Sequence, residues 1–151
     1  TYFHPSAYAH NLPIINDTPQ NQYRREDVSV HYNSEKSMAY MDIAPAYALD
    51  YLKKLERSFT FDDCSVTIND KYTFTNESQV TERFLSLVEP KVDGDTVMID
   101  DVVLLRRDNI LPSITTKVVI AHVTGLPHNV YILDYALPKG VDEFELTFKV
   151  K

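Results

Sequence analysis

Residues 114–151 read ITTKVVIAHVTGLPHNVYILDYALPKGVDEFELTFKVK, and this stretch predicts three strands joined by two tight turns. Its last strand alternates apolar with polar side chains: Phe144, Leu146, Phe148 and Val150 against Glu143, Glu145, Thr147 and Lys149. Successive residues of a strand point to opposite faces, so one face of this strand is expected to be packed and the other wet. Gly125–His128 and Pro138–Gly140 supply the turn residues that bound the strands.

Further strands are predicted on the N-terminal side of this region. They are Val28–Tyr32, Met38–Ile43, Phe59–Asn69 (with a turn following at Asn69–Lys71) and the apolar stretch Val97–Leu105, which Asp100–Asp101 interrupts. Residues 1–25 contain three prolines and no sustained period. They are expected to form an extended N-terminal arm, followed by a single β domain over residues 26–151.

Two helices are predicted in the middle of the chain. Pro45 opens the first, which runs to Arg57 with leucines recurring at helical spacing. The second runs over Glu77–Val88, because Asn76 and Gln79 form a capping-box pair and Pro90 ends the pattern. Its apolar stripe is expected to pack on the sheet and consists of Val80, Phe84, Leu87 and Val88.

Composition excludes several classes of protein. The chain has 151 residues, enough for one domain with a hydrophobic core. Its net charge of −7 argues against a protein that grips nucleic acid by the phosphates. Cys64 is the only cysteine, which excludes an intrachain disulfide and a thiolate metal cluster. We expect Cys64 to be a small buried side chain.

The candidate chemical groups do not assemble into a catalytic pattern. Asp62–Asp63 and Asp100–Asp101 are acidic doublets, but adjacent strand residues point to opposite faces and so do not form a preformed carboxylate pair. The five histidines show no metal-type spacing. Arg24–Arg25 and Arg106–Arg107 are isolated doublets, expected to be solvated or paired at an interface. The sequence therefore predicts no enzyme, no metal site and no cofactor.

Three segments resemble the tail tube protein family of contractile-tailed bacteriophages. The first is Thr60–Ile68, the second is the predicted helix, and the third covers Gly125–Val130, Leu133–Tyr135 and Phe144–Phe148. The residues that carry the resemblance are Phe61, Asp62, Asp63, Phe84, Gly125, Pro127, Tyr135, Phe144 and Phe148. Together the segments span about residues 59–151, and Pro45–Arg57 departs from the family pattern, in which this region is extended.

The resemblance implies a mainly β fold, an antiparallel β-sandwich or half-open barrel flanked by one α-helix. It implies a structural virion protein of the phage tail, assembled in the host cytoplasm as stacked hexameric rings with a continuous inner β-barrel. The implied partners are sheath, tape-measure and baseplate proteins, with DNA passing through the lumen unbound and no membrane involved. The N-terminal arm would then contact neighbouring subunits.

On this hypothesis the lumen face is acidic, because negative charge repels the phosphates of passing DNA. Glu143 and Glu145 are the candidate lumen-facing residues, since their strand neighbours point into the core. Alternatives are a specialised ring of the same type (tube initiator, baseplate-tube junction or tail terminator) and a small-ligand-binding β-barrel. A hydrolase that uses the aspartate doublets is a third class.

Overall fold

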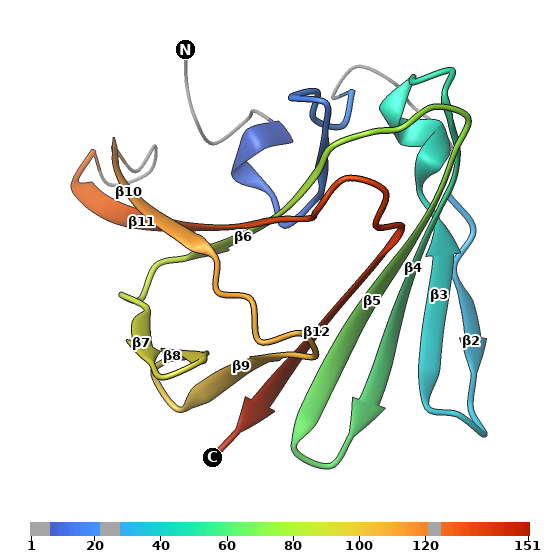
Figure 1. Ribbon diagram of the computed structural model, residues 1–151. Coiled ribbons are helices and arrows are strands. Elements are labelled where there is room, and N and C mark those ends of the chain that lie inside the picture. Colours follow the sequence, from blue (N-terminus) through green and yellow to red (C-terminus); the bar gives the residue numbers. More distant parts are fainter. Residues whose placement is uncertain (1–6, 22–27, 121–124) are drawn as a thin grey trace.

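The computed structural model describes residues 7–21, 28–120 and 125–151, and in this part the chain forms two antiparallel sheets (Figure 1). The strands are β1 (Ile14–Ile15), β2 (His31–Asn33), β3 (Met38–Asp42), β4 (Leu52–Asp62), β5 (Ser65–Phe74), β6 (Val80–Ser86), β7 (Lys91–Asp93), β8 (Thr96–Ile99), β9 (Val102–Arg106), β10 (Ser113–Ile120), β11 (Pro127–Ala136) and β12 (Glu143–Val150). Two short 3-10 helices accompany them, η1 (Ala7–Ala9) and η2 (Ala44–Tyr47). No helix in the described residues is long and apolar enough to cross a membrane.

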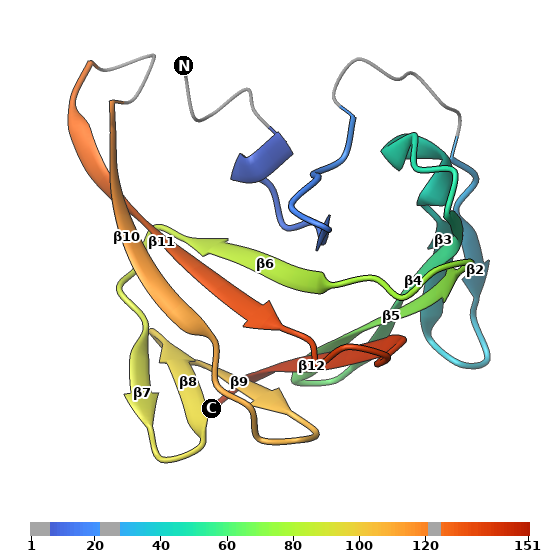
Figure 2. The same ribbon diagram turned by 45° about the horizontal axis from the view of Figure 1, so that its top comes forward.

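One sheet has four strands in the order β1-β6-β11-β10, and the other has eight in the order β2-β3-β4-β5-β12-β9-β8-β7. The larger sheet curves from β7 to β2, and the smaller one lies across its inner side (Figure 2). The apolar core lies between them and includes Leu55, Phe84, Leu104, Leu133 and Leu146. The prediction of a mainly β, antiparallel two-sheet fold is confirmed at this level.

The C-terminal region follows its sequence pattern. β10, β11 and β12 confirm the three predicted strands. On β12, Phe144 and Leu146 are buried and Phe148 is half-buried, while Glu143 on the other face is exposed. Val150 is 53% exposed, because the strand ends beyond the packed part of the sandwich. The predicted strand residues 121–124 lie outside the described residues.

The predicted helix Glu77–Val88 is wrong, because this segment forms strand β6. Val80, Glu82 and Phe84 are buried in alternation, whereas Leu87 of the expected helical stripe is 71% exposed. β6 pairs with β11 along Thr81–Ser86 and with β1 at Val80 and Thr81, so it belongs to the four-stranded sheet. Consequently no α-helix flanks the sheets in the part of the chain that the structure describes.

The predicted helix Pro45–Arg57 is also wrong, because most of this segment is extended and its second half belongs to β4. Only η2 is helical, and it ends where Ala48 adopts φ 52°. A register shift between Leu52 and Lys54 marks a bulge in β4. An extra residue in a strand brings positions three apart onto one face. Leu52 and Leu55 are therefore both buried at a spacing that imitates a helix.

The acidic doublets occupy hairpin turns. The predicted strand Phe59–Asn69 is interrupted after Asp62, and the chain reverses through Asp63 and Cys64 before β5 begins. Asn69–Lys71, expected as a turn, lies inside β5. Cys64 is exposed, which corrects the expectation of a buried side chain. Asp100–Asp101 joins β8 to β9 in the same manner.

Residues 7–21 pack on the domain itself. Ile14 and Ile15 form β1 against β6, and Ile15 is fully buried. The Asn11 carbonyl accepts a hydrogen bond from the buried Arg57 side chain at 2.7 Å. For these residues the expectation that they do not pack on the core of their own subunit is wrong, and contact with neighbouring subunits stays a prediction. Residues 1–6 and 22–25 lie outside the described part, so the arm boundary at residue 25 stays a prediction.

Candidate functional site

Four residues of the family resemblance meet in the core. The ring centroid of Phe84 lies 6.1 Å from that of Tyr135, 6.0 Å from Phe144 and 5.6 Å from Phe148. These aromatic residues come from β6, β11 and β12, so they fasten the two sheets together. Their role in this structure is packing.

The remaining residues of the resemblance lie apart from this cluster. Phe61 is 45% exposed near the end of β4, and the Asp62 side chain accepts a hydrogen bond from the Asp63 backbone in the hairpin turn. Gly125 has φ +67°, a conformation that favours glycine, and Pro127 begins β11. None of these residues lines the pocket described below.

A charged cluster is buried between the sheets. Arg57 Nε lies 2.8 Å from Asp70 Oδ1, and Arg57 Nη2 lies 3.4 Å from Glu82 Oε2. The Tyr72 hydroxyl donates a hydrogen bond to Glu82. Burial, and then the neighbouring Asp70 carboxylate, raise the pKa of Glu82 well above its usual range. One arginine thus faces two buried carboxyl groups, and the cluster ties β6 to β4 and β5 out of reach of a ligand.

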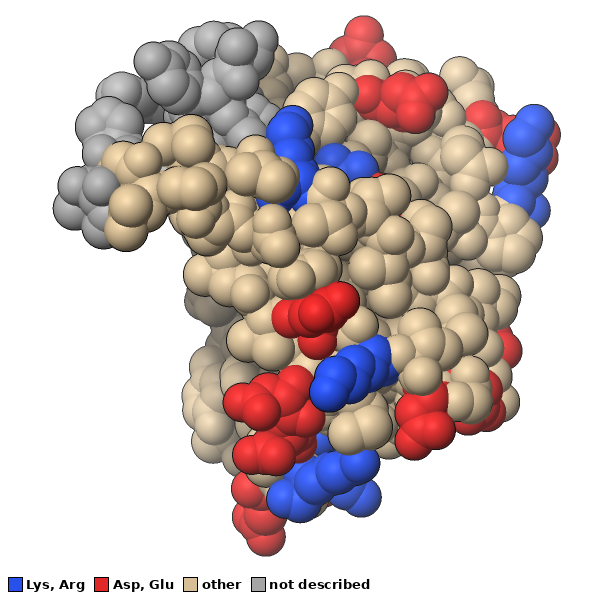
Figure 3. All heavy atoms as spheres, turned by 90° about the vertical axis from the view of Figure 1, so that its left-hand side faces the viewer, with Lys and Arg blue, Asp and Glu red and all other residues tan. Residues whose placement is uncertain are grey.

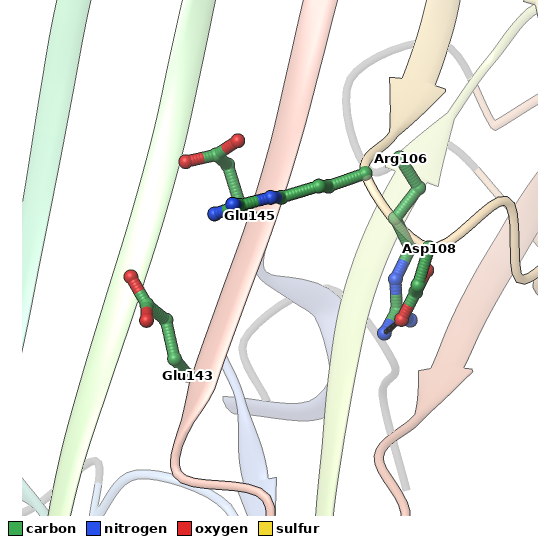
Figure 4. Close-up of a pocket in the computed structure, with 5 residues that line it drawn as sticks. Arg106, Asp108, Glu143 and Glu145 are labelled. Atoms are coloured by element: carbon green, nitrogen blue, oxygen red, sulfur yellow. Dashed lines mark hydrogen bonds and ion pairs between the residues drawn. The ribbon is translucent and has the colours of Figure 1, made fainter.

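A pocket opens where the eight-stranded sheet is incomplete. β12 pairs with β5 from Glu143 onward, but it pairs with β9 only from Leu146 onward, because β9 ends at Arg106. Residues 143–145 therefore have a strand on one side only. The pocket there has a volume of about 370 Å³ and is lined by Arg106, Arg107, Asp108, Glu143 and Glu145 (Figure 4).

Arg106 lines this pocket, and its guanidinium is packed on the core side of the sheet. It is 8% exposed, and its guanidinium carbon lies 5.0 Å from the centroid of the Phe144 ring and 5.6 Å from that of Tyr135. Nη2 pairs with the Asp108 carboxylate. Nη1 is buried and has no hydrogen-bond acceptor among the described residues. A buried donor without an acceptor is unusual in folded proteins.

Glu143 and Glu145, the candidate lumen residues, lie on the opposite wall. The Asn69 side-chain amide donates to Glu143 at 2.8 Å and to Glu145 at 3.4 Å. Lys71 Nζ lies 3.5 Å from Glu143. The hydrogen bond from Asn69, with the nearby Lys71 charge, lowers the pKa of Glu143. The two glutamates are therefore part of a surface of mixed charge.

Sequence reasoning missed the arginines of this pocket. The expectation of an isolated doublet at Arg106–Arg107, solvated or paired at an interface, does not describe Arg106, which is buried and lines the pocket. Arg106 ends β9 and pairs with Asp108 two residues later, a proximity that is visible in the sequence but does not indicate that Arg106 is buried. Mixed charge extends to the side of the molecule seen in Figure 3, where acidic and basic side chains alternate over its lower part.

Comparisons with known proteins show a similarity of fold alone. No protein-family model and no curated protein matches the chain. Among solved structures, a heparan sulfate lyase from Pedobacter heparinus is similar over 93% of this chain, with 10% identity and a TM-score of 0.63. A heparinase III with methylated lysines gives 95% coverage, 12% identity and a TM-score of 0.65. A further heparinase III is similar over 93% of this chain, with 14% identity and a TM-score of 0.61. The chain spans about a quarter of these proteins, from 23% to 24% of their length.

Proposed function

We propose that this chain is the β-sandwich domain of a longer protein that processes a polysaccharide, and that the domain binds the glycan. The observation that carries the proposal is the coverage of the structural similarity. Between 93% and 95% of this chain matches 23–24% of lyases that act on heparan sulfate or are named heparinase III. A match of nearly the whole chain to a quarter of a longer one is what a shared domain produces.

The surface chemistry suits binding. The pocket beside β12 offers guanidinium groups that donate hydrogen bonds and carboxylates that accept them. Sugar hydroxyl groups both donate and accept, so they are able to bond to both kinds of side chain. Ligand pockets in proteins commonly combine a few such polar groups with a rigid scaffold, and here two paired strands supply that scaffold.

Affinity electrophoresis tests this proposal. The purified chain is run through native gels that contain hydroxyethylcellulose, galactomannan, hyaluronan or heparin. We expect slower migration in at least one gel, relative to a reference protein that binds no glycan. Unchanged migration in all of the gels would overturn the proposal.

The second candidate is the tube subunit that the family resemblance implies, either as the bulk component of stacked hexameric rings or as a specialised ring. The observation that favours it is the position of Glu143 and Glu145 on the side of β12 that faces away from the core, as a lumen lining requires. Negative-stain electron microscopy of the concentrated protein separates the candidates. Rings or tubes would support the tube, and isolated particles would count against it.

A further inference from the structure

We infer that the glycan lies across the outer face of the eight-stranded sheet, along a row of side chains that leads into the pocket beside β12, and that it carries few charges. The row consists of His31, Tyr40, Ser58, Asn69 and Glu145. This inference rests on the proposed function, and it adds the binding surface and the class of glycan.

The strand register places these side chains in line. His31 pairs with Tyr40, Tyr40 with Ser58, Ser58 with Asn69, and Asn69 with Glu145. Directly paired residues of neighbouring strands share a face of the sheet. The row crosses five strands, so at a strand spacing of about 4.8 Å it extends over roughly 19 Å. A surface of this length accommodates an extended chain of several sugar residues.

The row lies on the side that faces away from the core. On β4, β5 and β12 the residues next to the row are buried: Arg57, Asp70, Phe144 and Leu146. Since successive strand residues alternate, Ser58, Asn69 and Glu145 point outward. His31 and Tyr40 at one end of the row are exposed.

The aromatic end of the row fits the apolar face of a sugar ring. The His31 and Tyr40 rings stack with centroids 5.1 Å apart and planes inclined by 22°. Aromatic side chains with a polar edge combine apolar contact with hydrogen bonding, which suits a ligand that has both kinds of surface.

The other end of the row fits hydroxyl groups. Asn69 donates hydrogen bonds to both Glu143 and Glu145, which holds the two carboxylates in place on this face. Carboxylates accept hydrogen bonds, so a sugar hydroxyl at this end of the row would donate to them.

The charges indicate which glycans fit. The pocket contains two arginines and three carboxylates, and the whole chain has a net charge of −7. Like charges repel, and the effect is strongest at low ionic strength. A heavily sulfated glycan would therefore meet Glu143 and Glu145 unfavourably. A neutral glycan or one with few carboxylates avoids this repulsion, in contrast to the heparan sulfate that the similar lyase is named for.

Two tyrosines on adjacent strands provide a matched test. Tyr40 belongs to the row, whereas Tyr32 is 66% exposed and pairs with Ala39, which alternates with Tyr40 and so faces the opposite side of the sheet. In affinity electrophoresis with the glycan that retards the wild-type chain most, we expect Tyr40→Ala and Glu145→Gln each to raise the dissociation constant about tenfold, which corresponds to about 1.4 kcal/mol. Tyr32→Ala should leave it unchanged. Circular dichroism and thermal unfolding confirm that each variant folds.

The outcomes separate this inference from the proposed function. If the wild type is retarded but Tyr40→Ala and Glu145→Gln bind as the wild type does, the glycan lies elsewhere and only this inference fails. If Tyr32→Ala weakens binding as much as Tyr40→Ala, the assignment of the glycan to the outer face of the sheet is wrong. Tighter binding to heparin than to the uncharged polysaccharides would overturn the assignment of glycan class. Absence of retardation for the wild type would instead remove the proposed function itself.

Discussion

The C-terminal region and the middle of the chain are both built from strands, but only the C-terminal region has a sequence pattern that predicts strands. β12 keeps a strict alternation of apolar and polar residues over Glu143–Val150. β6 has the same alternation in the structure, but one of its buried positions is the glutamate Glu82. With that position polar, Val80 and Phe84 remain as an apolar pair four residues apart, which is helical spacing. A single buried carboxyl group thus changes the apparent period of a strand.

The largest expected effect tests whether the middle region is a strand. Phe84→Ala should lower the free energy of unfolding by about 3–5 kcal/mol, because it empties a buried aromatic position. Leu87→Ala should change it by less than about 0.5 kcal/mol, because Leu87 is 71% exposed. The measurement is urea denaturation followed by circular dichroism. Large losses of unfolding free energy in both variants would mean that Phe84 and Leu87 are both buried, as in a helix, and would contradict the strand.

A second prediction extends the comparison to residues 7–21, which have no periodic pattern at all. Ile15→Ala should lower the free energy of unfolding by about 2–5 kcal/mol, because Ile15 is fully buried beside β6. Val30→Ala is the control, since Val30 is 62% exposed and should lose less than about 0.5 kcal/mol. Equal, small losses in the two variants would mean that the N-terminal segment is an arm after all.

The third prediction concerns Glu82, the buried glutamate that interrupts the apolar alternation of β6. A carboxyl whose pKa is raised by folding favours the folded state most when it is protonated. Because the pKa of Glu82 is raised in this way, the free energy of unfolding should fall as the pH rises from about 5 toward the tyrosine range near 10. Glu82→Gln removes this ionisation and should show a flatter profile between about pH 5 and pH 9. Parallel profiles for the two proteins would contradict the prediction.

The prediction with the smallest expected effect tests whether the face of β12 that carries Glu143 is exposed to solvent. Glu143→Gln removes the ion pair with Lys71, whose side chain is 59% exposed against 47% for Glu143. Exposed pairs contribute little, so the loss in unfolding free energy should be below about 1 kcal/mol. Phe144→Leu on the packed face is the comparison in the same denaturation experiment, and it should lose more. A loss above about 2 kcal/mol for Glu143→Gln would show that this face is covered.

The sequence predicts the fold where local pattern and tertiary packing agree. The alternation in β12 and the glycine or proline turns around β11 are local, and the structure confirms these strands. The bulge at Leu52–Lys54 and the buried Glu82 depend on contacts far along the chain: Leu52 pairs with Phe74, and Glu82 contacts Arg57 and Tyr72. Patterns within a short window carry no information about such partners.

The pocket was predictable only in part. The alternation in β12 places Glu143 and Glu145 away from the core, on the face where they line the pocket. The other wall requires β9 to stop at Arg106 while β12 continues to Glu143, and that difference in strand length is a property of the sheet. The Arg106 guanidinium packs against the rings of Phe144 and Tyr135, and both of these residues are more than twenty-five positions away along the chain.

The lengths of the outermost strands have a further consequence. β2 and β7 bound the larger sheet with three residues each, and β1 bounds the smaller one with two. Such short borders offer few free backbone groups to an incoming strand. β10 is different, because it has eight residues and no described strand beyond it. Among the border strands in the described residues, β10 therefore has the longest edge without a strand beside it, and another polypeptide, either a neighbouring domain or a second copy in a ring, could pair there.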